Sequence, residues 1–566
     1  MKQLLLFSVL SIFCLKISAQ TNTWVGNNGY WETAGNWSLN LVPNQNHDVI
    51  IPTGSTVLLN VDGYTKSITL QGNAIFNFID TSSLKLSFTN ASSFSAASNF
   101  NWSGGTITGG GTLTLNGTTV ITPENTYYVK RIEGNTTIIN NGIILQQGSA
   151  DFIIKDGTII NRASGVIDLQ VEGADIVRHA NPLTNLIINE GTIKRTGTGR
   201  VDIEIGFENN GGTISVEGGT LRINGLSNNF TDGIYNVATG SLMEWRGDFL
   251  LAGTLTGVLN GDIQCGDGAL CSFNIPVGTT ANFNFSGNAN MFWKAGAQMG
   301  GGTLVNSGKI YIKPNNNWKI IENSTFTNSG LINIGGSTGS DLRIEDGTLI
   351  NQAGGIIDLQ ADSADILIPS GSTTNMFINE GLIKRTGTGR AEISPEFHNN
   401  NGTISVEGGT LRFSGLPKYM TDGFYNVSMG GLMEWRTDIV CAGILTGSLE
   451  GDILCGAGTS YCRLNVPNGN SATLNFTGNA NLFFNAGYQE GGGTLVNSGK
   501  IFIAPTNNWK IQENSTLSNL GLINIGGSTG SDLRIEDGTL INQVGGVIDG
   551  KQIAQIFLLL AQAYII

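Results

Sequence analysis

Histidine, proline and charged residues are all scarce in this chain. Only three of its 566 residues are His, eleven are Pro and 13% are charged. The histidines His47, His179 and His398 share no repeat position, and none has a partner at the spacing of a zinc site or a Ser/His/Asp triad. We therefore expect neither a histidine-based metal centre nor triad catalysis.

The chain also has few residues that favour helices. Ala, Glu and Lys are scarce beside Asn, Thr, Ile and the 80 glycines, which points to an all-β fold. Low proline fits a fold in which almost every backbone N–H is needed for strand pairing. The net charge of −13 argues against nucleic acid and anionic membrane as partners. Carbohydrate, protein and divalent cations stay open.

The N-terminus has the pattern of an export signal. Lys2 supplies the charge, Leu4–Leu15 the apolar stretch, and Ile17–Ala19 the small-residue cleavage site before Gln20. Such a stretch is too short for a membrane span. We predict that residues 1–19 are a signal peptide and that the protein is exported from a bacterium, to the outer cell surface or the extracellular space.

Cysteine usage fits an oxidising compartment. Beyond the signal, four of five cysteines form close pairs at matching positions, Cys265/Cys271 and Cys455/Cys462, each across a short Gly-rich segment. Each pair can close a small loop as a disulfide, with free thiols as the alternative. Cys441 stands where the earlier copy has Leu251, so we expect it to be a buried apolar substitute.

The chain repeats itself at an offset of about 190 residues. Gly301–Ile350 and Gly492–Ile541 differ at only seven of fifty positions, and Asp151–Gln170 matches Asp341–Gln360 in a more diverged copy. We predict a Trp-rich N-terminal cap at 20–60, with Trp24, Trp31 and Trp37, followed by the first coils at 61–100. Repeat 1 then covers 101–291, repeat 2 covers 292–482 and a partial repeat 3 covers 483–549.

A shorter period lies inside each repeat. An apolar residue is followed two positions later by Asn, then by Gly and an alternating apolar pair. Successive Asn positions are 22, 23, 28, 20 and 27 residues apart, the length of one solenoid coil: Asn306, Asn328, Asn351, Asn379, Asn399 and Asn426. Stacked coils would align these side chains as an amide ladder, with glycines supplying positive φ at the corners.

These periods predict a right-handed parallel β-helix, a β-solenoid of about twenty coils with three short strands in each. Alternation places Ile310 and Ile312 on one strand face, with polar residues outside. An array of β-sandwiches is the competing architecture. It would give strands every 8–12 residues and irregular loops, without a fixed Asn–Gly corner.

The start of the mature chain, TWVGNNGYWETAGNWS followed by Asp48–Pro52, resembles the start of secreted Bacteroidetes-type β-helix repeat proteins. These are adhesin-like surface proteins, often exported by a system that recognises a C-terminal sorting domain. The resemblance implies an adhesin-like surface protein. It rests on some thirty residues and on the style of the coils.

The last residues, 550–566, match nothing upstream. We interpret them as a frame-shifted tail, with a membrane anchor as the alternative. Gln552–Phe557 can be encoded by the codons CAG-ATA-GCG-CAG-ATA-TTT. With one G placed before them and the frame shifted accordingly, the same bases encode Ala-Asp-Ser-Ala-Asp-Ile, the string found at Ala361–Ile366.

Two kinds of charged cluster recur. Ile-Lys-Arg-Thr-Gly-Thr-Gly-Arg occurs twice, and its cations would contact a glycan or, as we favour, lie on solvated turns: Lys194, Arg195, Arg200, Lys384, Arg385 and Arg390. Acidic clusters also recur: Asp341/Glu345/Asp346, Asp532/Glu536/Asp537 and Asp358/Asp362/Asp365. Because they recur, we interpret them as turn and coil-to-coil contacts. Catalysis and calcium binding are the alternatives.

The sequence thus predicts an exported structural or adhesive repeat protein, with a carbohydrate-active β-helix enzyme, a polysaccharide lyase or glycosidase, as the alternative. We expect no cofactor, with calcium left open, and a carbohydrate or protein partner at a surface. The sequence does not predict the identity of the partner or the oligomeric state.

Overall fold

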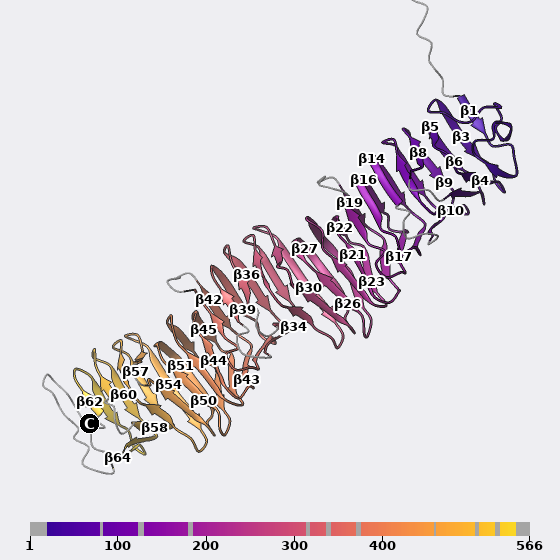
Figure 1. The fold of residues 1–566 in the computed structure, drawn as a ribbon. Coiled ribbons are helices and arrows are strands. Elements are labelled where there is room, and N and C mark those ends of the chain that lie inside the picture. Colours follow the sequence, from indigo (N-terminus) through magenta and orange to yellow (C-terminus); the bar gives the residue numbers. More distant parts are fainter. Residues whose placement is uncertain are drawn as a thin grey trace, which may run out of the picture. The chain divides into compact units, whose positions relative to one another are not determined.

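The structure, a computed structural model, describes residues 20–79, 83–122, 130–178, 185–312, 317–335, 341–369, 375–457, 460–503, 509–526 and 533–550. The predicted signal peptide, His179, Asp532 and the tail from Lys551 onward lie outside these residues. About 61% of the chain is strand, arranged as a parallel β-solenoid of about 21 turns (Figure 1). Among the described residues the one helical element is the 3₁₀ turn η1 (Ala34–Asn36). The predicted all-β solenoid is confirmed.

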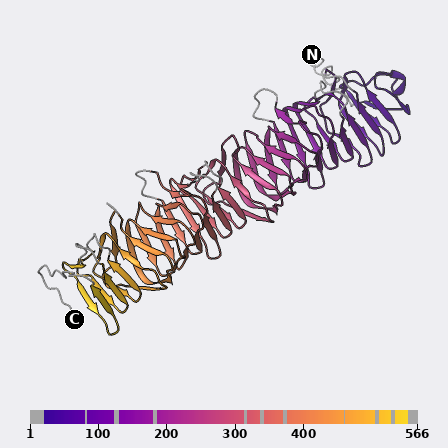
Figure 2. The ribbon, with the colours of Figure 1, turned by 60° about the horizontal axis from the view of Figure 1, so that its bottom comes forward.

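The chain divides into two units, one ending at Gly225 and the other starting at Leu226. In each unit most strands pair in parallel with the strand three places further along the chain, and the strands form three stacks (Figures 1 and 2). This pairing satisfies the backbone groups of each coil through the coils before and after it.

The three stacks of unit 1 follow from the strand pairings. The first contains β1 (Gln20–Thr23), β3 (His47–Ile51), β6 (Ser67–Leu70), β9 (Ser92–Phe94), β12 (Thr112–Leu115), the second halves of β14 (Lys130–Asn140) and β16 (Phe152–Asn161), β19 (Leu186–Asn189) and β22 (Gly206–Asn210). The second contains β2 (Asn28–Tyr30), β4 (Thr56–Leu59), β7 (Ile75–Phe78), β10 (Asn99–Trp102), β13 (Thr118–Ile121), β15 (Ile143–Gln146), β17 (Val166–Leu169), β20 (Thr192–Arg195) and β23 (Thr213–Val216). The third contains β5 (Gly63–Thr65), β8 (Lys85–Phe88), β11 (Gly105–Thr108), the first halves of β14 and β16, β18 (Ile176–Arg178), β21 (Arg200–Ile203) and β24 (Thr220–Ile223).

In unit 2 we name the stacks A, B and C. Stack A contains the second halves of β25 (Asn228–Val237) and β27 (Gly247–Val258), β30 (Thr280–Ser286), β33 (Thr303–Asn306), β36 (Ser324–Asn328), β39 (Gly347–Asn351), β42 (Met376–Asn379), β45 (Glu396–Asn400), β48 (Lys418–Thr421), the first half of β51 (Asp438–Ser448), β53 (Cys462–Asn465), β56 (Gly487–Glu490), β59 (Trp509–Ile511) and β62 (Leu533–Ile535). Stack B contains β26 (Leu242–Trp245), β28 (Asp262–Cys265), β31 (Met291–Trp293), β34 (Lys309–Ile312), β37 (Leu331–Ile334), β40 (Ile356–Leu359), β43 (Leu382–Arg385), β46 (Thr403–Val406), β49 (Phe424–Val427), the second half of β51, β54 (Ser471–Thr477), β57 (Thr494–Asn497), β60 (Thr516–Asn519) and β63 (Thr539–Asn542). Stack C contains the first halves of β25 and β27, β29 (Cys271–Asn274), β32 (Gly296–Met299), β35 (Trp318–Ile320), β38 (Leu342–Ile344), β41 (Ile366–Leu367), β44 (Arg390–Ile393), β47 (Thr410–Phe413), β50 (Leu432–Trp435), β52 (Asp452–Cys455), β55 (Leu482–Phe484), β58 (Lys500–Ile503), β61 (Leu522–Ile525) and β64 (Val547–Gly550).

Strand alternation builds the interior. In β34, Ile310 and Ile312 are buried while Lys309 and Tyr311 point outward. In register above them, β37 buries Ile332 and Ile334 in the same way. Like residues therefore stack on like residues along the axis, and each buried Ile contributes about 1.5–3 kcal/mol relative to an exposed one.

The Trp-rich N-terminal segment is buried. Trp24, Trp31 and Trp37 are each at most 1% exposed, and Trp37 packs edge-on against the other two at centroid distances of 5.0 and 4.9 Å. The same segment also supplies paired strands, because β1 pairs with β3 and β2 with β4. Solenoid pairing is thus already present at Gln20, within the segment predicted as a cap and before the predicted first coils at residue 61.

The predicted amide ladder is present. In stack A the side-chain Nδ2 of Asn306 donates to Oδ1 of Asn328, and the bond repeats through Asn351 and Asn379 to Asn399, at 2.7–2.9 Å. All five amides are at most 1% exposed. A shorter ladder in unit 1 joins four amides in the same way: Asn140, Asn161, Asn189 and Asn209.

The glycines of the Asn-x-Gly corners are required for a reason other than the predicted positive φ. Gly308 and Gly330 are not in the left-handed region. Instead, a Cβ on Gly330 would overlap the carbonyl oxygen of Gly308 in the preceding coil. Close approach of successive backbones, rather than backbone conformation, excludes a side chain here.

Each repeat of about 190 residues ends one strand out of phase with the coils. β57 is the counterpart of β33, and their labels differ by 24. Because the two halves of β51 lie in stack A and stack B, this strand counts as two segments, so β57 lies 25 strand segments after β33. That is eight coils plus one strand. The ladder of the third copy, Asn497–Asn519–Asn542, accordingly lies in stack B, whereas its counterpart lies in stack A.

The same phase shift corrects the interpretation of Asn426. This residue lies on β49 in stack B, in register with Ser405. Its side chain is half-buried and accepts a hydrogen bond from the backbone N–H of Ser448 at 3.0 Å. The stack A ladder ends instead at Asn399, which donates to the Tyr425 hydroxyl at 3.0 Å. The prediction that Asn426 continues the ladder is therefore wrong.

Candidate functional site

The repeated cation motif divides between the inside and the outside of the coil. Arg195 on β20 and Arg385 on β43 have no exposed surface. Arg385 donates through Nη1 to the carbonyl oxygens of Leu359 and Ala361, both at 2.7 Å, and through Nη2 to Gly389 at 2.6 Å. Burial lowers the pKa of the Arg385 guanidinium, opposed by nearby Asp carboxylates.

Arg195 is held in the same way, by the carbonyls of Leu169 at 2.8 Å, of Gly199 at 3.2 Å and of Thr198. The proposed surface role is therefore wrong for Arg195 and Arg385. Each guanidinium instead ties its strand to the preceding coil and to its own turn.

The other cations of the motif lie at or near the surface. Lys384 pairs with Glu407 at 3.1 Å, and Arg200 pairs with Asp202 at 3.0 Å. Arg390 is exposed and Lys194 half-buried. With the arginine between them buried, the remaining cations do not form the contiguous basic patch that the sequence motif suggests.

The repeated carboxylates bind the next coil. Asp358 accepts a hydrogen bond from the Thr386 hydroxyl at 2.8 Å, Asp362 from the backbone N–H of Arg390 at 2.9 Å, and Asp365 from the backbone N–H of Glu392 at 2.7 Å. In the first copy Asp168 and Asp175 make the equivalent bonds. The interpretation of this cluster as coil-to-coil contacts is confirmed.

Desolvation by burial raises the pKa of Asp365 to about 6. The charges of Asp341 and Glu392 add to the shift, and Arg390 opposes it. One Asp365 oxygen is already used as an acceptor for the next coil, so the altered pKa belongs to a structural contact.

The other acidic clusters form ion pairs along the coils. Asp341 pairs with Arg343 at 3.3 Å and Glu345 with Lys319 at 3.0 Å. Glu536 pairs with Lys510 at 2.9 Å, while Asp537 accepts the backbone N–H of Glu513 at 2.7 Å. No group of three or more His, Cys, Asp or Glu side chains able to hold a metal ion occurs in the part of the chain that the structure describes.

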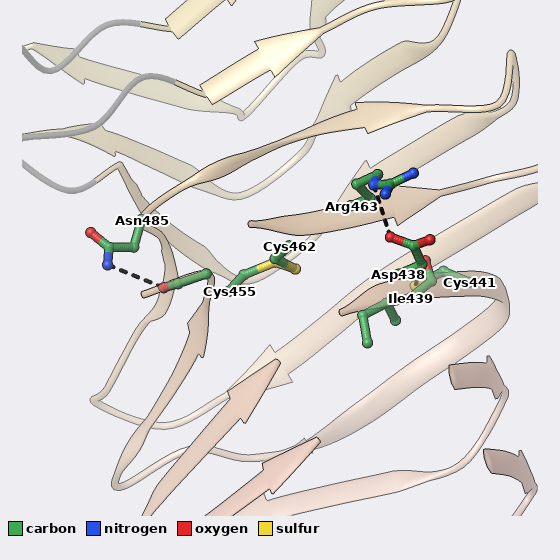
Figure 3. The surroundings of a disulfide bond; sticks show 8 residues. Asp438, Ile439, Cys441, Cys455, Cys462, Arg463 and Asn485 are labelled. Atoms are coloured by element: carbon green, nitrogen blue, oxygen red, sulfur yellow. Dashed lines mark hydrogen bonds and ion pairs between the residues drawn. A yellow bond between two sulfur atoms is a disulfide. The ribbon is translucent and has the colours of Figure 1, made fainter. Parts of the chain in front are cut away.

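Both predicted disulfides are present. Cys265–Cys271 joins the end of β28 to the start of β29, with a Cα–Cα distance of 5.5 Å. Cys455–Cys462, shown in Figure 3, joins β52 to β53 with a Cα–Cα distance of 5.3 Å. All four cysteines are buried, so each disulfide closes a corner from inside the coil. Cys441 is a buried free thiol, as expected from its replacement of Leu251.

The two described histidines have structural surroundings. His47 Nδ1 accepts the backbone N–H of Asn44 at 3.3 Å. His398 contacts Glu396 at 2.8 Å and stacks on the Tyr419 ring at a centroid distance of 4.3 Å. This is one outward contact between neighbouring strands of stack A.

A shallow groove of about 440 Å³ follows successive A–B corners of unit 2. It lies where corner glycines leave no side chain, between apolar side chains such as Phe285, Leu331 and Ile356. Lys309 lines it and donates to the Gly287 carbonyl at 3.2 Å. The third copy keeps nearly the same residues at the equivalent corner, where Lys500 donates to the Gly478 carbonyl at 2.9 Å.

An outward patch on stack A combines an aromatic ring with charged and amide groups. We name it the Tyr488 patch and define it as Arg463, Tyr488, Glu490 and Gln512. Arg463, Tyr488 and Lys510 follow one another in register on β53, β56 and β59. The Arg463 guanidinium lies 6.0 Å from the Tyr488 ring centroid, and Gln512 Nε2 donates to a Glu490 oxygen at 3.4 Å.

Charged neighbours hold the Tyr488 patch in place. Arg463 Nε is 2.8 Å from an Asp438 oxygen, a contact visible beside the disulfide in Figure 3. Burial raises the pKa of Glu490, and the charge of Glu513 raises it further while Arg463 opposes the shift. The repeated motifs do not predict this patch, because its residues differ between the copies. The signal that could have revealed it is the set of positions at which the copies differ.

The chain matches no protein-family model and no curated protein. No helix within the described residues is long and apolar enough to cross a membrane.

Proposed function

We propose that the protein is an exported, non-catalytic structural or adhesive surface protein whose solenoid serves as a stalk or an extended binding face. The observation that carries this proposal is the use of the repeated carboxylates. Asp358, Asp362 and Asp365 each bond the next coil, so none is left as the free acid–base pair that glycoside cleavage needs.

The phase shift between copies supports the same conclusion. Counterpart strands such as β33 and β57 lie in different stacks of unit 2, so counterpart side chains do not line one groove. Such a duplication does not extend the substrate-binding groove of an enzyme, whereas it lengthens a stalk and gives an adhesin additional binding surfaces.

Export is part of the proposal. Two buried disulfides fit an oxidising compartment, since thiols of cytosolic proteins are kept reduced. The predicted signal peptide and the resemblance to adhesin-like proteins of Bacteroidetes type agree with an extracellular or outer-surface location.

The second candidate is a carbohydrate-active enzyme, a polysaccharide lyase or glycosidase. Asp365 favours it, because a carboxyl with a pKa of about 6 is suited to proton transfer near neutral pH. Its engagement by the Glu392 N–H weighs against this role.

One experiment separates the two candidates. Purified protein is incubated with neutral and acidic polysaccharides, and new reducing ends and unsaturated uronates are measured, with an Asp365→Asn variant as control. We expect no cleavage by either protein. Cleavage that Asp365→Asn abolishes would establish the enzyme and refute the structural role. Adhesion is measured separately, as retention of fluorescently labelled protein on intact cells.

A further inference from the structure

The Tyr488 patch exists in only one of two otherwise matching places. At the equivalent positions the earlier copy carries Ser272, Ala297, Met299 and Ile321. The backbone is the same in both, since Ser272, Ala297 and Lys319 follow one another in register on β29, β32 and β35. Two equivalent surfaces therefore carry different chemistry.

The charged groups around the patch do not change. Asp438, Lys510 and Glu513 correspond to Asp248, Lys319 and Glu322. Of the fifty positions from Gly492 to Ile541 only seven differ from the earlier copy, and Gln512 is one of them. Four differences between the copies thus fall on side chains that lie together, with Arg463 over the Tyr488 ring and Gln512 bonded to Glu490.

A gain of solubility does not explain the patch. Replacing Met and Ile by Glu and Gln makes a surface more polar, but replacing Ala297 by Tyr488 adds a large half-buried ring to the outside of a sheet. Tyrosine and arginine are among the residue types enriched at binding hot spots, and here the Arg463 guanidinium lies over the Tyr488 ring.

We propose that the Tyr488 patch binds a neutral, hydroxyl-rich glycan chain. The ring offers a flat apolar face for the C–H side of a sugar. Around it, Glu490 supplies acceptors, Gln512 supplies both donors and acceptors, and Arg463 supplies donors, which together match a ring of hydroxyl groups.

Charge decides against an acidic glycan. Asp438, Glu490 and Glu513 surround the ring. Burial raises the pKa of the Tyr488 hydroxyl, Arg463 opposes the shift, and each of the three carboxylates adds to it. In a chain of net charge −13, a polyuronate or sulfated chain would meet repulsion that one guanidinium and one paired lysine do not offset. The inference rests on the proposed adhesive function and names its ligand class.

The chain itself supplies the control variants. The swap variant R463S/Y488A/E490M/Q512I places the earlier copy's residues on the same backbone, and the reverse graft S272R/A297Y/M299E/I321Q builds a second patch. Binding of neutral hexasaccharides of glucose, mannose, galactose and xylose, with an oligouronate for comparison, is measured by titration calorimetry on the full chain. Circular dichroism confirms that each variant is folded.

We expect one neutral hexasaccharide to bind at one site per chain. The swap variant and Tyr488→Ala should each raise the Kd at least tenfold, Tyr488→Phe should change it less than threefold, and the reverse graft should give two sites. A folded swap variant that keeps the Kd within threefold overturns the inference, as does binding of the oligouronate in place of every neutral sugar.

Failure of this inference is distinguishable from failure of the proposed function. If labelled swap variant is retained on cells as well as the wild-type chain, the patch is refuted and adhesion stands. If the wild-type chain is not retained but binds a hexasaccharide through the patch, the adhesive function fails and the glycan site stands.

Discussion

Replacing Asn351 by Leu tests the amide ladder at its centre. Asn351 receives a bond from Asn328 at 2.9 Å and gives one to Asn379 at 2.8 Å. It also donates to the carbonyls of Gly355 and Leu382, both at 3.3 Å. Leu has the same branching at Cγ and is larger than Asn, so the change removes hydrogen bonds without opening a cavity.

The cost follows from these contacts. Two ladder bonds between buried amides contribute about 1 kcal/mol each, and the Asn379 acceptor, left buried without its donor, adds about 1–3 kcal/mol. Asn328 loses less, because its Nδ2 keeps the carbonyls of Gly330 and Ile356. We expect Asn351→Leu to destabilise the surrounding coils by about 3–5 kcal/mol.

Asn426→Leu is the matched control. The two residues occupy the same place in the sequence pattern, but Asn426 points outward and holds a single backbone N–H. Its replacement should cost under about 1 kcal/mol. Because a solenoid need not unfold as one unit, hydrogen exchange by mass spectrometry is measured coil by coil, over peptides that cover β36, β39 and β42.

Only the Asn351 variant should accelerate exchange across those three strands. Equal effects of the two variants would show that the sequence pattern, and not the stack that holds the residue, decides its role. An effect of Asn351→Leu below about 1 kcal/mol would refute the energetic argument for the ladder.

Three further predictions concern buried groups. Arg385→Met should lower the unfolding free energy by about 3 kcal/mol, because it leaves the carbonyls that the guanidinium satisfies without a donor. The control Arg390→Met should cost under about 0.5 kcal/mol. Both are measured by denaturant unfolding, and equal costs would contradict the burial of Arg385. Replacing Cys455 and Cys462 together by Ser should destabilise the corner between β52 and β53 by about 2.5 kcal/mol, because the unfolded chain gains loop entropy. The effect is measured as faster hydrogen exchange in these two strands. Unchanged exchange would mean that the disulfide adds no stability. Burial lowers the pKa of Lys418 to about 7, so above that pH the folded chain has released a proton that the unfolded chain keeps, and stability should rise from about pH 7 toward pH 10. Denaturant titrations across this pH range should show that Lys418→Met loses the rise. The same pH profile in the variant and the wild-type chain would refute the prediction.

The coil could be predicted from the sequence because a short pattern of Asn, Gly and alternating apolar residues recurs at the length of one coil. Asn306, Asn328 and Asn351 recur at coil length, followed by Gly and alternating Ile, and each feature has a physical meaning without reference to the rest of the chain. The paired cysteines were predictable for the same reason, since a short Gly-rich segment holds them within bonding distance.

The phase of the repeat could not be predicted. Spacing alone does not reveal that four strands rather than three lead from β45, which carries Asn399, to β49, which carries Asn426. Asn426 therefore fits the sequence period but lies in another stack, because the number of strands in a stretch of given length depends on where the chain turns.

The burial of Arg195 and Arg385 could have been predicted from alternation. Ile193 and Ile383 point inward, and a period of two places the arginine two residues later on the same inward face. The adjacent Lys and Arg instead suggested one basic surface, because charged residues are rarely buried. The carbonyls of Leu359, Ala361 and Gly389 make the exception possible, and they are invisible in a linear pattern.

A repeat that is not a whole number of coils is tolerated because each ladder ends inside its own copy. Asn399 closes the stack A ladder on the Tyr425 hydroxyl, which in turn donates to the Asp422 carbonyl at 3.2 Å, so no buried amide donor at the end of that ladder requires another Asn in the next coil. The next ladder can then start at Asn497 in stack B. The same shift places the Tyr488 patch on stack A and its apolar counterpart on stack C. Side chains on one face can therefore change without altering the equivalent face of the other copy, which is how a duplicated stalk can acquire a binding site that is not itself duplicated.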